Sequence, residues 1–218
     1  MIKFENVDVH GFEAAIRGMR NPKNSWAKSD SHPGLSGDGW KYDPGYIIGP
    51  ADKELMLKLN AGGPVHAKYR RQIVVWVDIT APLYWWKEFD TYKVGTVANS
   101  CSTMHKIHEK EFELDDFSHE HLFLGPLNYL TELVALLNHW RTEYHNAATE
   151  ERKKQCWWQL IQLLPSSYNQ KRTISMSYEN LASMYTYRRN HKLDEWADAF
   201  MDFIKDLPYS EIITTNLN

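Results

Sequence analysis

Two long helical patterns that follow one another directly constrain the fold of this chain more than any other feature. From Pro126 to about Ala148, apolar residues recur at three- and four-residue steps, which is the spacing of one buried helix face. These residues are Leu130, Leu133, Leu137, Trp140 and Tyr144. A second helix is expected from about Thr149 to Leu164, and Pro165 ends it. The two patterns together predict a chain that is rich in helix.

Shorter patterns complete the expected elements. The segment Gln72–Thr80 is rich in β-branched residues and is followed by Ala81-Pro82, which predicts a strand. Residues 170–177 alternate in polarity and predict another strand. Further helices are expected at residues 12–20, 51–60, 178–189 and 193–207. Several helices and few strands predict a helix-rich α+β fold.

The length of 218 residues favours a single domain over residues 1–218, with a sizeable core. Residues 21–50 are rich in Gly, Pro, Ser and Asp, and predict a long surface loop. Within this loop, Gly34–Gly39 superficially resembles a phosphate-binding loop. No strand pattern precedes it and no convincing helix follows it, so a turn-rich surface segment is the better interpretation.

Charge, hydropathy and cysteine content exclude several classes of protein. The net charge of -3 and the average charge content argue against a nucleic-acid partner. No apolar run reaches the ~18 residues that a bilayer-spanning helix needs, and the first residues lack a signal-peptide pattern. Cys101 and Cys156 lack the Cys-x-x-Cys spacing of zinc and redox motifs. A cytoplasmic protein with no membrane partner is therefore expected.

The aromatic content is high, with nine Trp, twelve Tyr and eight Phe. Such residues fill cores, but they also line interfaces and flat cofactor sites. Trp85-Trp86 and Trp157-Trp158 are adjacent pairs, whose side chains diverge on a helix or a strand. We therefore expect at least one member of each pair to meet a partner subunit or a flat ligand.

Two polar clusters are candidates for chemistry. Ser100-Cys101-Ser102 lies near His105, so a nucleophile and its base are conceivable, but an anion-binding loop of hydroxyls and backbone N–H groups is favoured. A hydrolase using Ser102 or Cys101 with His105 or His108 stays a distant alternative. Ser118–His121 contains potential metal ligands, but no further Cys or His completes a site, so no metal is expected.

Tyr187-Arg188-Arg189 falls near the end of a predicted helix. One arginine there complements the helix dipole. A second arginine that projects elsewhere is suited to holding a planar carbonyl group or a phosphate.

Three sequence blocks, taken in order, resemble blocks of the flavin-dependent thymidylate synthases. The first is Val65-His66 before the strand 72–80, where the family carries a histidine, commonly after a glutamate. The third keeps the family spacing from Leu164-Pro165 to a helix that ends in an arginine, here Arg188. The segment Asp194-Glu195-Trp196 then resembles the closing Gln-Trp-Glu of the family.

The second block, Glu88–Met104, lies in the place of the family signature Arg-His-Arg, two residues, Ser, four residues, Ser, one residue, Arg. Thr91-Tyr92-Lys93 occupies the Arg-His-Arg place. Thr96 and Ser102 stand for the two serines, with one residue inserted, and Met104 stands for the last arginine. The three blocks run from about residue 60 to residue 205.

The resemblance implies a helix-rich single α+β domain with a small, mostly antiparallel sheet, assembled as a homotetramer that binds FAD. It implies methyl transfer to a pyrimidine deoxynucleotide, dUMP to dTMP, with methylenetetrahydrofolate and NADPH as cosubstrates. Arg188 and Ser102 would be catalytic. The cofactor-binding residues would be His66, Tyr92, Lys93, Thr96 and Asn99, and the substrate-binding residues would be Glu88, Ser100, Ser102, Arg172 and Arg188.

Because the signature has lost its arginines, a second hypothesis stands beside the enzyme. A non-catalytic protein on the same fold would bind or sequester a nucleotide. A closely related flavin or nucleotide reaction is a further variant of the first hypothesis.

Overall fold

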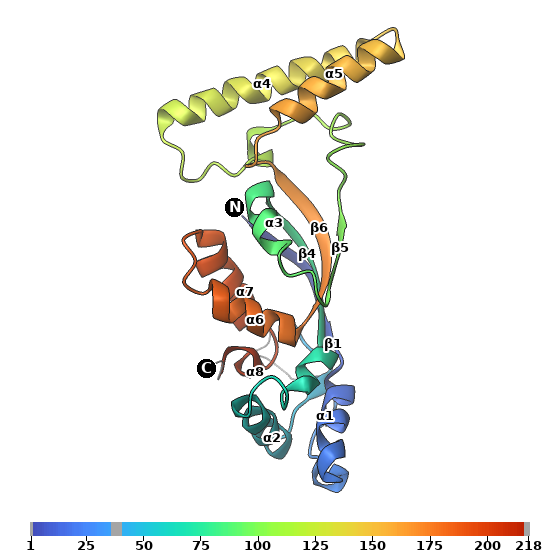
Figure 1. The fold of residues 1–218 in the computed structure, drawn as a ribbon, viewed down its shortest axis with the longest axis vertical. Coiled ribbons are helices and arrows are strands. Elements are labelled where there is room, and N and C mark those ends of the chain that lie inside the picture. The colour runs from blue at the N-terminus through green and yellow to red at the C-terminus, as the bar shows by residue number, and fades with distance from the viewer. Residues whose placement is uncertain (1, 36–40, 216–218) are drawn as a thin grey trace. The chain divides into compact units, whose positions relative to one another are not determined.

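The computed structural model describes residues 2–35 and 41–215 (Figure 1). The strands are β1 (Lys3–His10), β2 (His32–Pro33), β3 (Tyr46–Ile47), β4 (Val74–Pro82), β5 (Thr96–Ser100) and β6 (Asn169–Ser177). The α-helices are α1 (Phe12–Arg20), α2 (Pro50–Ala61), α3 (Leu83–Phe89), α4 (Leu124–Asn146), α5 (Glu150–Leu163), α6 (Tyr178–Arg188), α7 (Met201–Asp206) and α8 (Glu211–Thr214). A π-helical segment, η5 (Glu195–Phe200), precedes α7, and short 3₁₀ helices are η1 (Asn21–Lys23), η2 (Trp26–Lys28), η3 (Lys68–Gln72) and η4 (Leu114–Asp116).

The main sheet is small and antiparallel, with the strand order β1-β4-β6-β5, so β1 and β5 are its edges. The short strands β2 and β3 form a separate antiparallel pair, in which His32 faces Ile47. Residue contacts group the chain into two compact units. Unit 1 contains residues 1–3, 79–91 and 99–172, and unit 2 contains residues 4–78, 92–98 and 173–218. The expectation of one domain over residues 1–218 stays a prediction.

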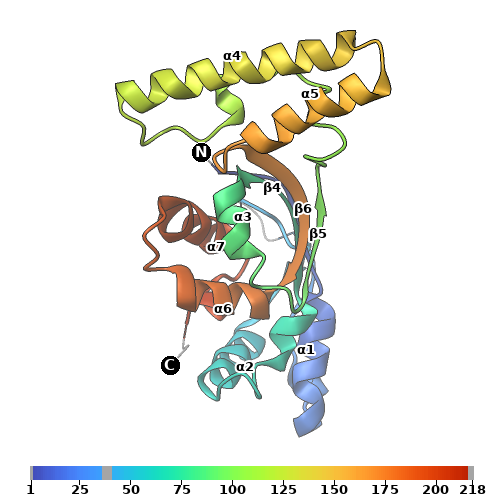
Figure 2. The ribbon, with the colours of Figure 1, turned by 45° about the horizontal axis from the view of Figure 1, so that its top comes forward.

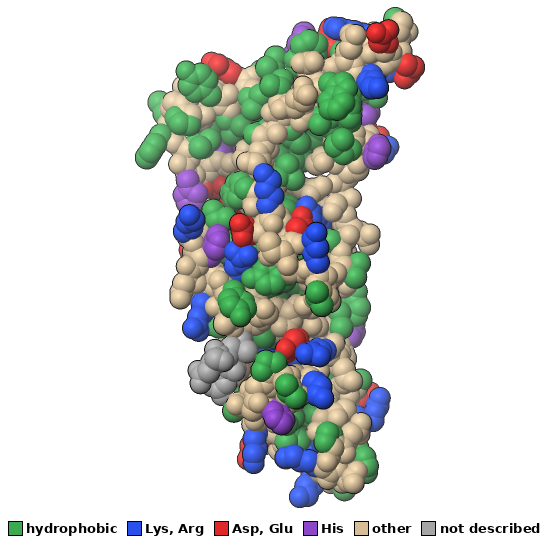
Figure 3. Space-filling view, viewed as in Figure 1, with side chains coloured by type: hydrophobic (Ala, Val, Ile, Leu, Met, Phe, Trp, Pro, Cys, Tyr) green, Lys and Arg blue, Asp and Glu red, His purple; other side chains and the backbone are tan. Residues whose placement is uncertain are grey.

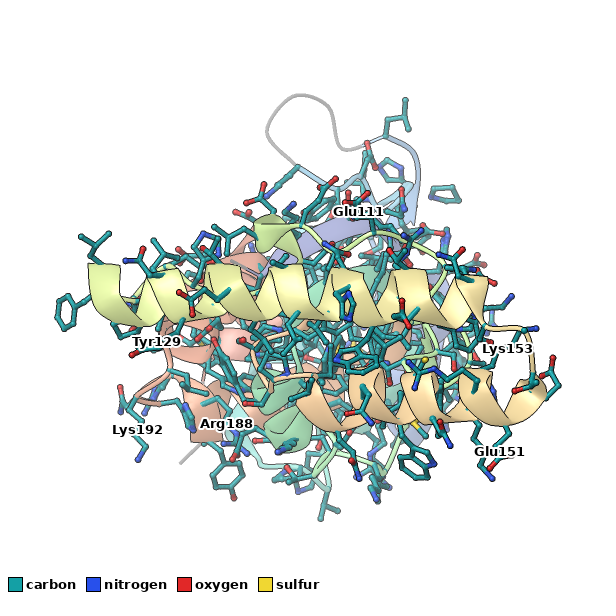
Figure 4. The ribbon with its side chains drawn as sticks, turned by 90° about the horizontal axis from the view of Figure 1, so that it is seen from above. Glu111, Tyr129, Glu151, Lys153, Arg188 and Lys192 are labelled. Atoms are coloured by element: carbon teal, nitrogen blue, oxygen red, sulfur yellow. The ribbon has the colours of Figure 1, made fainter. Side chains whose placement is uncertain are left out.

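In unit 1, helices α4 and α5 lie side by side and form a hairpin (Figures 2 and 4). Thr149, in the turn between them, is the N-cap of α5, and its side chain accepts a hydrogen bond from the backbone N–H of Arg152. The predicted apolar stripe of α4 faces the core of this unit, where Leu130 and Leu137 are buried. Leu160 of α5 is buried in the same core, together with Phe112 and Phe117 from the segment before α4.

The burial of Trp85 and Trp86 contradicts the expectation that one of them meets a partner subunit or a flat ligand. Both side chains lie in α3 and both are buried, although adjacent helix residues point about 100° apart. The two rings meet edge to face, and each contacts the ring of Phe89. Nε1 of Trp86 also donates to the carbonyl oxygen of Gln170 at 2.9 Å. Because α3 is covered on more than one side, both tryptophans belong to a core, and neither meets solvent.

In unit 2, the core brings aromatic residues from distant segments together. Tyr178 is fully buried at the start of α6, and its hydroxyl donates to the carbonyl oxygen of Pro208 at 2.6 Å. Phe12 meets the rings of Tyr178 and Tyr209 edge to face. The apolar residues at three- and four-residue steps along 193–207 form one face: Trp196, Phe200, Phe203 and Leu207 are buried, and Leu193 is half-buried. Tyr178 thus ties the N-terminus of α6 to the C-terminal segment.

The predicted helices at 12–20, 51–60, 126–148, 149–164 and 178–189 are present within one or two residues at each end. The expected helix over 193–207 is interrupted by the π-helical segment. The expected loop over 21–50 contains η1, η2, β2 and β3, and residues 36–40 with most of Gly34–Gly39 lie outside the described residues. Strands β1 and β5 and helix α3 were not predicted. Among the described helices, none combines the length and hydropathy that crossing a bilayer requires.

A buried ion pair in unit 2 joins α1 to α2. Nε of Arg20 donates to Oδ1 of Asp52 at 2.6 Å, and both side chains are almost fully buried. Asp52 also accepts hydrogen bonds from the hydroxyls of Ser29 and Ser31, each at 2.7 Å. Burial raises the pKa of Asp52, but the hydrogen bonds from Ser31, Ser29 and Arg20 outweigh it, so its pKa lies below the usual value. The carboxylate therefore stabilises the fold in its charged form.

We predict that Asp52→Asn lowers the free energy of unfolding by about 3–5 kcal/mol, because it leaves Arg20 charged and buried without a counter-charge. Since the pKa of Asp52 is depressed in the folded state, its contribution is present above the unfolded pKa of about 3.9 and is lost as the pH falls through the folded pKa. Asp206→Asn is the matched control, because Asp206 pairs with Lys41 at an exposed site, and about 0–1 kcal/mol is expected. Denaturant unfolding at pH 7 and pH 3 measures both. Equal losses in the two variants would contradict this account.

Candidate functional site

The candidate site in unit 2 is centred on Arg188, the last residue of α6. Its Nε donates to the hydroxyl oxygen of Tyr92 at 2.9 Å. Its guanidinium carbon lies 5.4 Å from the ring centre of Tyr92 and 5.2 Å from the ring centre of Trp196. These distances are typical of cation–π contacts, which orient a guanidinium as well as stabilise it. Figure 4 shows Arg188 on the same side of the view as Lys192.

Trp196 reaches Arg188 from the π-helical segment η5. A π-helical turn carries one extra residue, and such turns are frequent at functional sites. Trp196 is fully buried and lies 6.3 Å from Tyr92 between ring centres. The side chain of Trp196 therefore supports both Arg188 and the residue to which Arg188 is bonded.

Asn180 connects α6 to the segment that carries Tyr92. Ser177 is the N-cap of α6, and both its backbone N–H and its hydroxyl donate to Oδ1 of Asn180, at 3.0 and 2.7 Å. Nδ2 of Asn180 donates to the carbonyl oxygen of Val94 at 2.7 Å. One amide side chain thus closes the helix cap and holds the chain two residues from Tyr92.

Gly95 makes room for this contact. Its φ of +80° lies in the left-handed region, and a Cβ added there would be 3.0 Å from Oδ1 of Asn180. A glycine is thus required both by the backbone conformation and by the approach of the Asn180 amide.

Three of the predicted cofactor-binding residues, Tyr92, Lys93 and Thr96, lie on or next to this segment. Lys93 is exposed and follows Tyr92 directly. Thr96 begins β5, and its hydroxyl donates to the carbonyl oxygen of Tyr92 at 2.5 Å. Tyr92 therefore contacts Arg188 directly, Lys93 follows Tyr92 in the chain, and Thr96 is bonded to the backbone of Tyr92.

The other predicted site residues of the second block, Glu88, Asn99, Ser100 and Ser102, belong to unit 1. Asn99 and Ser100, at the end of β5, are exposed. The hydroxyl of Ser102 accepts a hydrogen bond from the backbone N–H of His105 at 3.0 Å. Ser102 therefore caps a turn, and this geometry does not favour a nucleophile paired with the His105 ring. Cys101 is exposed, with its carbonyl oxygen bound by Nε2 of Gln170 at 2.7 Å.

Arg172 and Glu88, both predicted to bind substrate, lie in unit 1. Nη1 of Arg172 pairs with Oδ1 of Asp90 at 2.8 Å, and its Nε donates to Oε1 of Gln170 at 3.0 Å. Its guanidinium carbon lies 4.2 Å from the ring centre of Trp86. Arg172 is thus engaged by the protein itself, while Glu88 is half-buried in α3. A substrate-binding role for either residue stays a prediction.

Several histidines have structural contacts. Nδ1 of His119 lies 2.8 Å from the carbonyl oxygen of Phe117, and Nε2 of His145 lies 2.9 Å from that of His108. Burial, with a smaller effect of His145, lowers the pKa of His108. Within residues 2–35 and 41–215, no group of three or more His, Cys, Asp or Glu residues is arranged to hold a metal ion.

His66 lies in unit 2, away from the second block in sequence. It is exposed on the wall of a cavity of about 510 Å³, together with residues of α1 and α2. Arg188 and Tyr92 do not line this cavity.

The sequence alone did not identify Asn180. Trp196 was noted as part of an apolar helix face and through the family spacing, but not as a partner of Arg188. Ser177 and Asn180 have the three-residue spacing of a capping box, but Asn replaces the usual Glu or Gln. The pattern around Ser177 was therefore detectable as a helix start. The contact with Val94 was not, because it joins residues far apart in the chain.

The fold resembles that of solved structures, whereas sequence comparison finds no relative. No protein-family model and no curated protein sequence matches the chain. The flavin-dependent thymidylate synthase ThyX from Helicobacter pylori, solved in complex with FAD and dUMP, matches with a TM-score of 0.65 and 19% identity over 96% of this chain and 97% of that chain. A second ThyX structure from the same organism, also with FAD and dUMP, gives a TM-score of 0.65 and 18% identity, over 98% of this chain and 96% of that one.

These matches define the class of fold. The chain is a helix-rich α+β protein with a small antiparallel sheet, and its fold is that of the ThyX structures. The fold implied by the sequence resemblance is therefore confirmed.

We predict that Asn180→Ala destabilises unit 2 by about 1–3 kcal/mol, because it removes a helix cap and the hydrogen bond to Val94. Amide hydrogen exchange at residues 92–95 should accelerate in this variant. Asn190→Ala is the control, since Asn190 is exposed just beyond α6. Unchanged exchange at residues 92–95 in Asn180→Ala would show that the amide does not hold this segment.

A second prediction concerns Gly95. Gly95→Ala should cost about 1–3 kcal/mol of unfolding free energy, because alanine is strained at this φ and its Cβ displaces Asn180. Gly63→Ala separates the two causes, since Gly63 also has a positive φ but no atom lies within 4 Å of the added Cβ. Denaturant unfolding should find the larger loss at Gly95, and an equal loss at Gly63 would exclude a contribution from Asn180.

Proposed function

We propose that this protein is a flavin-dependent enzyme that transfers a methyl group to a pyrimidine deoxynucleotide, converting dUMP to dTMP, or that it catalyses a closely related flavin and nucleotide reaction. The observation that carries the proposal is Arg188, oriented by Tyr92 and Trp196 at the end of α6. The likeness in fold to ThyX structures that contain FAD and dUMP supports it.

The proposed role of Arg188 is to hold and polarise the pyrimidine. A guanidinium stays charged at all relevant pH values and donates parallel hydrogen bonds, so it suits the carbonyl groups of a uracil ring. Withdrawal of charge towards these carbonyls would make the ring reactive without a cysteine nucleophile. The rings of Tyr92 and Trp196 fix the plane of the guanidinium, which lowers the entropy cost of binding a flat ring.

The residues from Tyr92 to Thr96 include the types of side chain that bind a flavin nucleotide. Lys93 supplies a cation for a phosphate, and the Thr96 hydroxyl and the Tyr92 ring supply a polar contact and a flat surface. Asn99 continues the same strand, and its side chain is exposed. We propose that Tyr92, Lys93, Thr96, Asn99 and His66 hold FAD, which when bound and reduced supplies hydride. Methylenetetrahydrofolate would be the carbon donor, and NADPH the reductant.

Ser102 and Ser100 are proposed to hold the nucleotide phosphate through hydroxyl and backbone N–H groups. The Ser102 hydroxyl accepts from the backbone N–H of His105 and keeps its own proton to donate to a phosphate oxygen. Glu88 and Arg172 would contribute to the same substrate. We further propose a homotetramer, on the basis of the family resemblance alone, and a cytoplasmic location, on the basis of the low cysteine content.

A non-catalytic nucleotide-binding protein is the second candidate, and a specific observation favours it. The Arg-His-Arg place is occupied by Thr91-Tyr92-Lys93, which retains one cation. If each lost charged contact is worth ~1.5–3 kcal/mol, loss of two weakens ligand binding by two orders of magnitude or more. Such a protein would bind a nucleotide without turnover.

We predict that Arg188→Ala weakens dUMP binding about ten- to hundredfold, because it removes one charged contact to the pyrimidine. The matched control is Arg189→Ala, since Arg189 is the next residue and is exposed. Calorimetric titration with dUMP measures the affinity, and denaturant unfolding checks that both variants stay folded. Equal dUMP affinity in the two variants would contradict a role for Arg188 in pyrimidine binding.

The enzyme and the binding protein are separated by one assay. The purified protein is predicted to absorb near 450 nm after incubation with FAD (about the typical flavin band) and to form dTMP from dUMP, methylenetetrahydrofolate and NADPH. Nucleotide binding with no flavin absorbance and no dTMP would favour the non-catalytic candidate. A protein that binds neither FAD nor dUMP would exclude both.

A further inference from the structure

Side chains of α4 bind the backbone of residues 102–112, the segment that precedes the helix in unit 1. Nδ2 of Asn138 donates to the carbonyl oxygen of Phe112 at 2.8 Å, and Oδ1 of Asn138 accepts from the N–H of Phe112 at 2.9 Å. Nη2 of Arg141 donates to the carbonyl oxygen of Glu109 at 3.2 Å. These bonds satisfy main-chain groups of the segment, so they order its backbone against the helix.

A further bond from α4 involves two histidines. Nε2 of His145 lies 2.9 Å from the carbonyl oxygen of His108, and since a carbonyl oxygen only accepts, this nitrogen carries a proton and donates it. Asn138, Arg141 and His145 follow one another at three- and four-residue steps, which places them on one face of the helix. We call these three side chains, together with the segment 102–112 that they bind, the α4 latch.

The ring of His108 is packed inside the α4 latch. Its centre lies 4.1 Å from the ring centre of Tyr144, with the two planes 37° apart. Its Nδ1 is buried and has no hydrogen-bond partner among the residues that the structure describes. In a neutral ring with the proton on Nε2, Nδ1 has only a lone pair and needs no acceptor. A second proton would make Nδ1 a buried donor without an acceptor, which costs free energy.

The charges around His108 also oppose a second proton. His145 and Arg141 face it from α4, and Lys106 faces it from the segment itself. Glu109 has the opposite effect, but its exposed carboxylate is paired with Lys106. Burial, followed by His145, lowers the pKa of His108. Figure 3 shows histidine and lysine side chains near one another at the surface beside α5, toward the right of the view.

We propose that the α4 latch is a pH-dependent switch, which is closed while His108 is neutral and opens when a proton from solvent binds Nδ1. The direction follows from linkage. Because the pKa of His108 is lower in the closed latch than in the open one, the closed state has its full stability above the ordinary pKa of about 6.5. This stability is lost as the pH falls from about 6.5 through the lower pKa of the closed latch.

The α4 latch is continuous with the turn at Ser102. The hydroxyl of Ser102 accepts from the N–H of His105 at 3.0 Å, and Nε1 of Trp157 donates to the carbonyl oxygen of Met104 at 2.8 Å. Opening of the latch loosens the chain that follows this turn, so acid should weaken the binding of a phosphate at Ser102. That consequence rests on the proposed function, whereas the switch itself does not.

Amide hydrogen exchange at Phe112 reports the state of the latch, because this N–H is bound to Asn138. Protection factors, corrected for the intrinsic effect of pH on exchange, are compared at about pH 7.5 and about pH 5. We expect the protection factor in the wild-type chain to fall about three- to tenfold, within the limit of tenfold per pH unit that one proton allows. His108→Gln, which stays neutral, should give equal protection at both pH values.

Two further variants and one internal reference make the result specific. His105→Gln is the matched control, because His105 is exposed in the same segment, and it should behave like the wild-type chain. Asn138→Ala removes both bonds to Phe112, so it shows the exchange of an open latch at both pH values. The amide of Leu160, buried in α5, should stay protected throughout, which distinguishes local opening from unfolding of unit 1.

Unchanged protection of Phe112 in the wild-type chain would overturn the proposal. So would an equal loss in His108→Gln, because another group would then open the segment, and so would a parallel loss at Leu160. An NMR titration of the wild-type chain tests the switch without any variant, and a pKa of His108 at or above about 6.5 would also overturn it. These measurements use no nucleotide or flavin, so a failure of the proposed function leaves them unaffected.

Discussion

The amide of Asn180 is the interaction on which the candidate site most depends. It closes the N-terminus of α6 through Ser177, and it holds the carbonyl oxygen of Val94. The helix that ends in Arg188 and the segment that carries Tyr92 are thereby fixed to each other near one end. The hydrogen bond from Arg188 to Tyr92 fixes them again near the other end.

These two connections order the side chains of the site, although the second block, Glu88–Met104, lacks arginine. The ring and the hydroxyl of Tyr92 both contact Arg188. Trp196, presented by a π-helical turn, supports the same guanidinium. Aromatic rings thus surround the Arg188 guanidinium, an arrangement that suits a flat ring more than several phosphates.

The sequence predicted the elements whose patterns are long and periodic. Helices α4 and α5 and the stripe Trp196–Leu207 follow directly from apolar spacing, because each buries one face. Short elements were missed: β5 has five residues and exposed side chains, so no burial pattern marks it. The burial of both Trp85 and Trp86 was also missed, since periodicity assumes one covered face and α3 is covered on more than one.

The site was predictable only in part, because its residues come from three separate segments. Arg188 and Tyr92 could be named from spacing within family blocks, but the contact between them could not. The role of Gly95 depends on a backbone conformation and on an amide from α6, neither of which a linear pattern contains. Arg172 was predicted to bind substrate, and its ion pair with Asp90 appears only in the fold.

The central claim is that α6 delivers Arg188 to a pyrimidine ring. A crystal structure of the protein with dUMP bound tests this claim most directly. The account predicts a uracil carbonyl oxygen within about 3 Å of the Arg188 guanidinium, with Tyr92 and Trp196 still against it. A nucleotide bound with its pyrimidine away from Arg188 would contradict it.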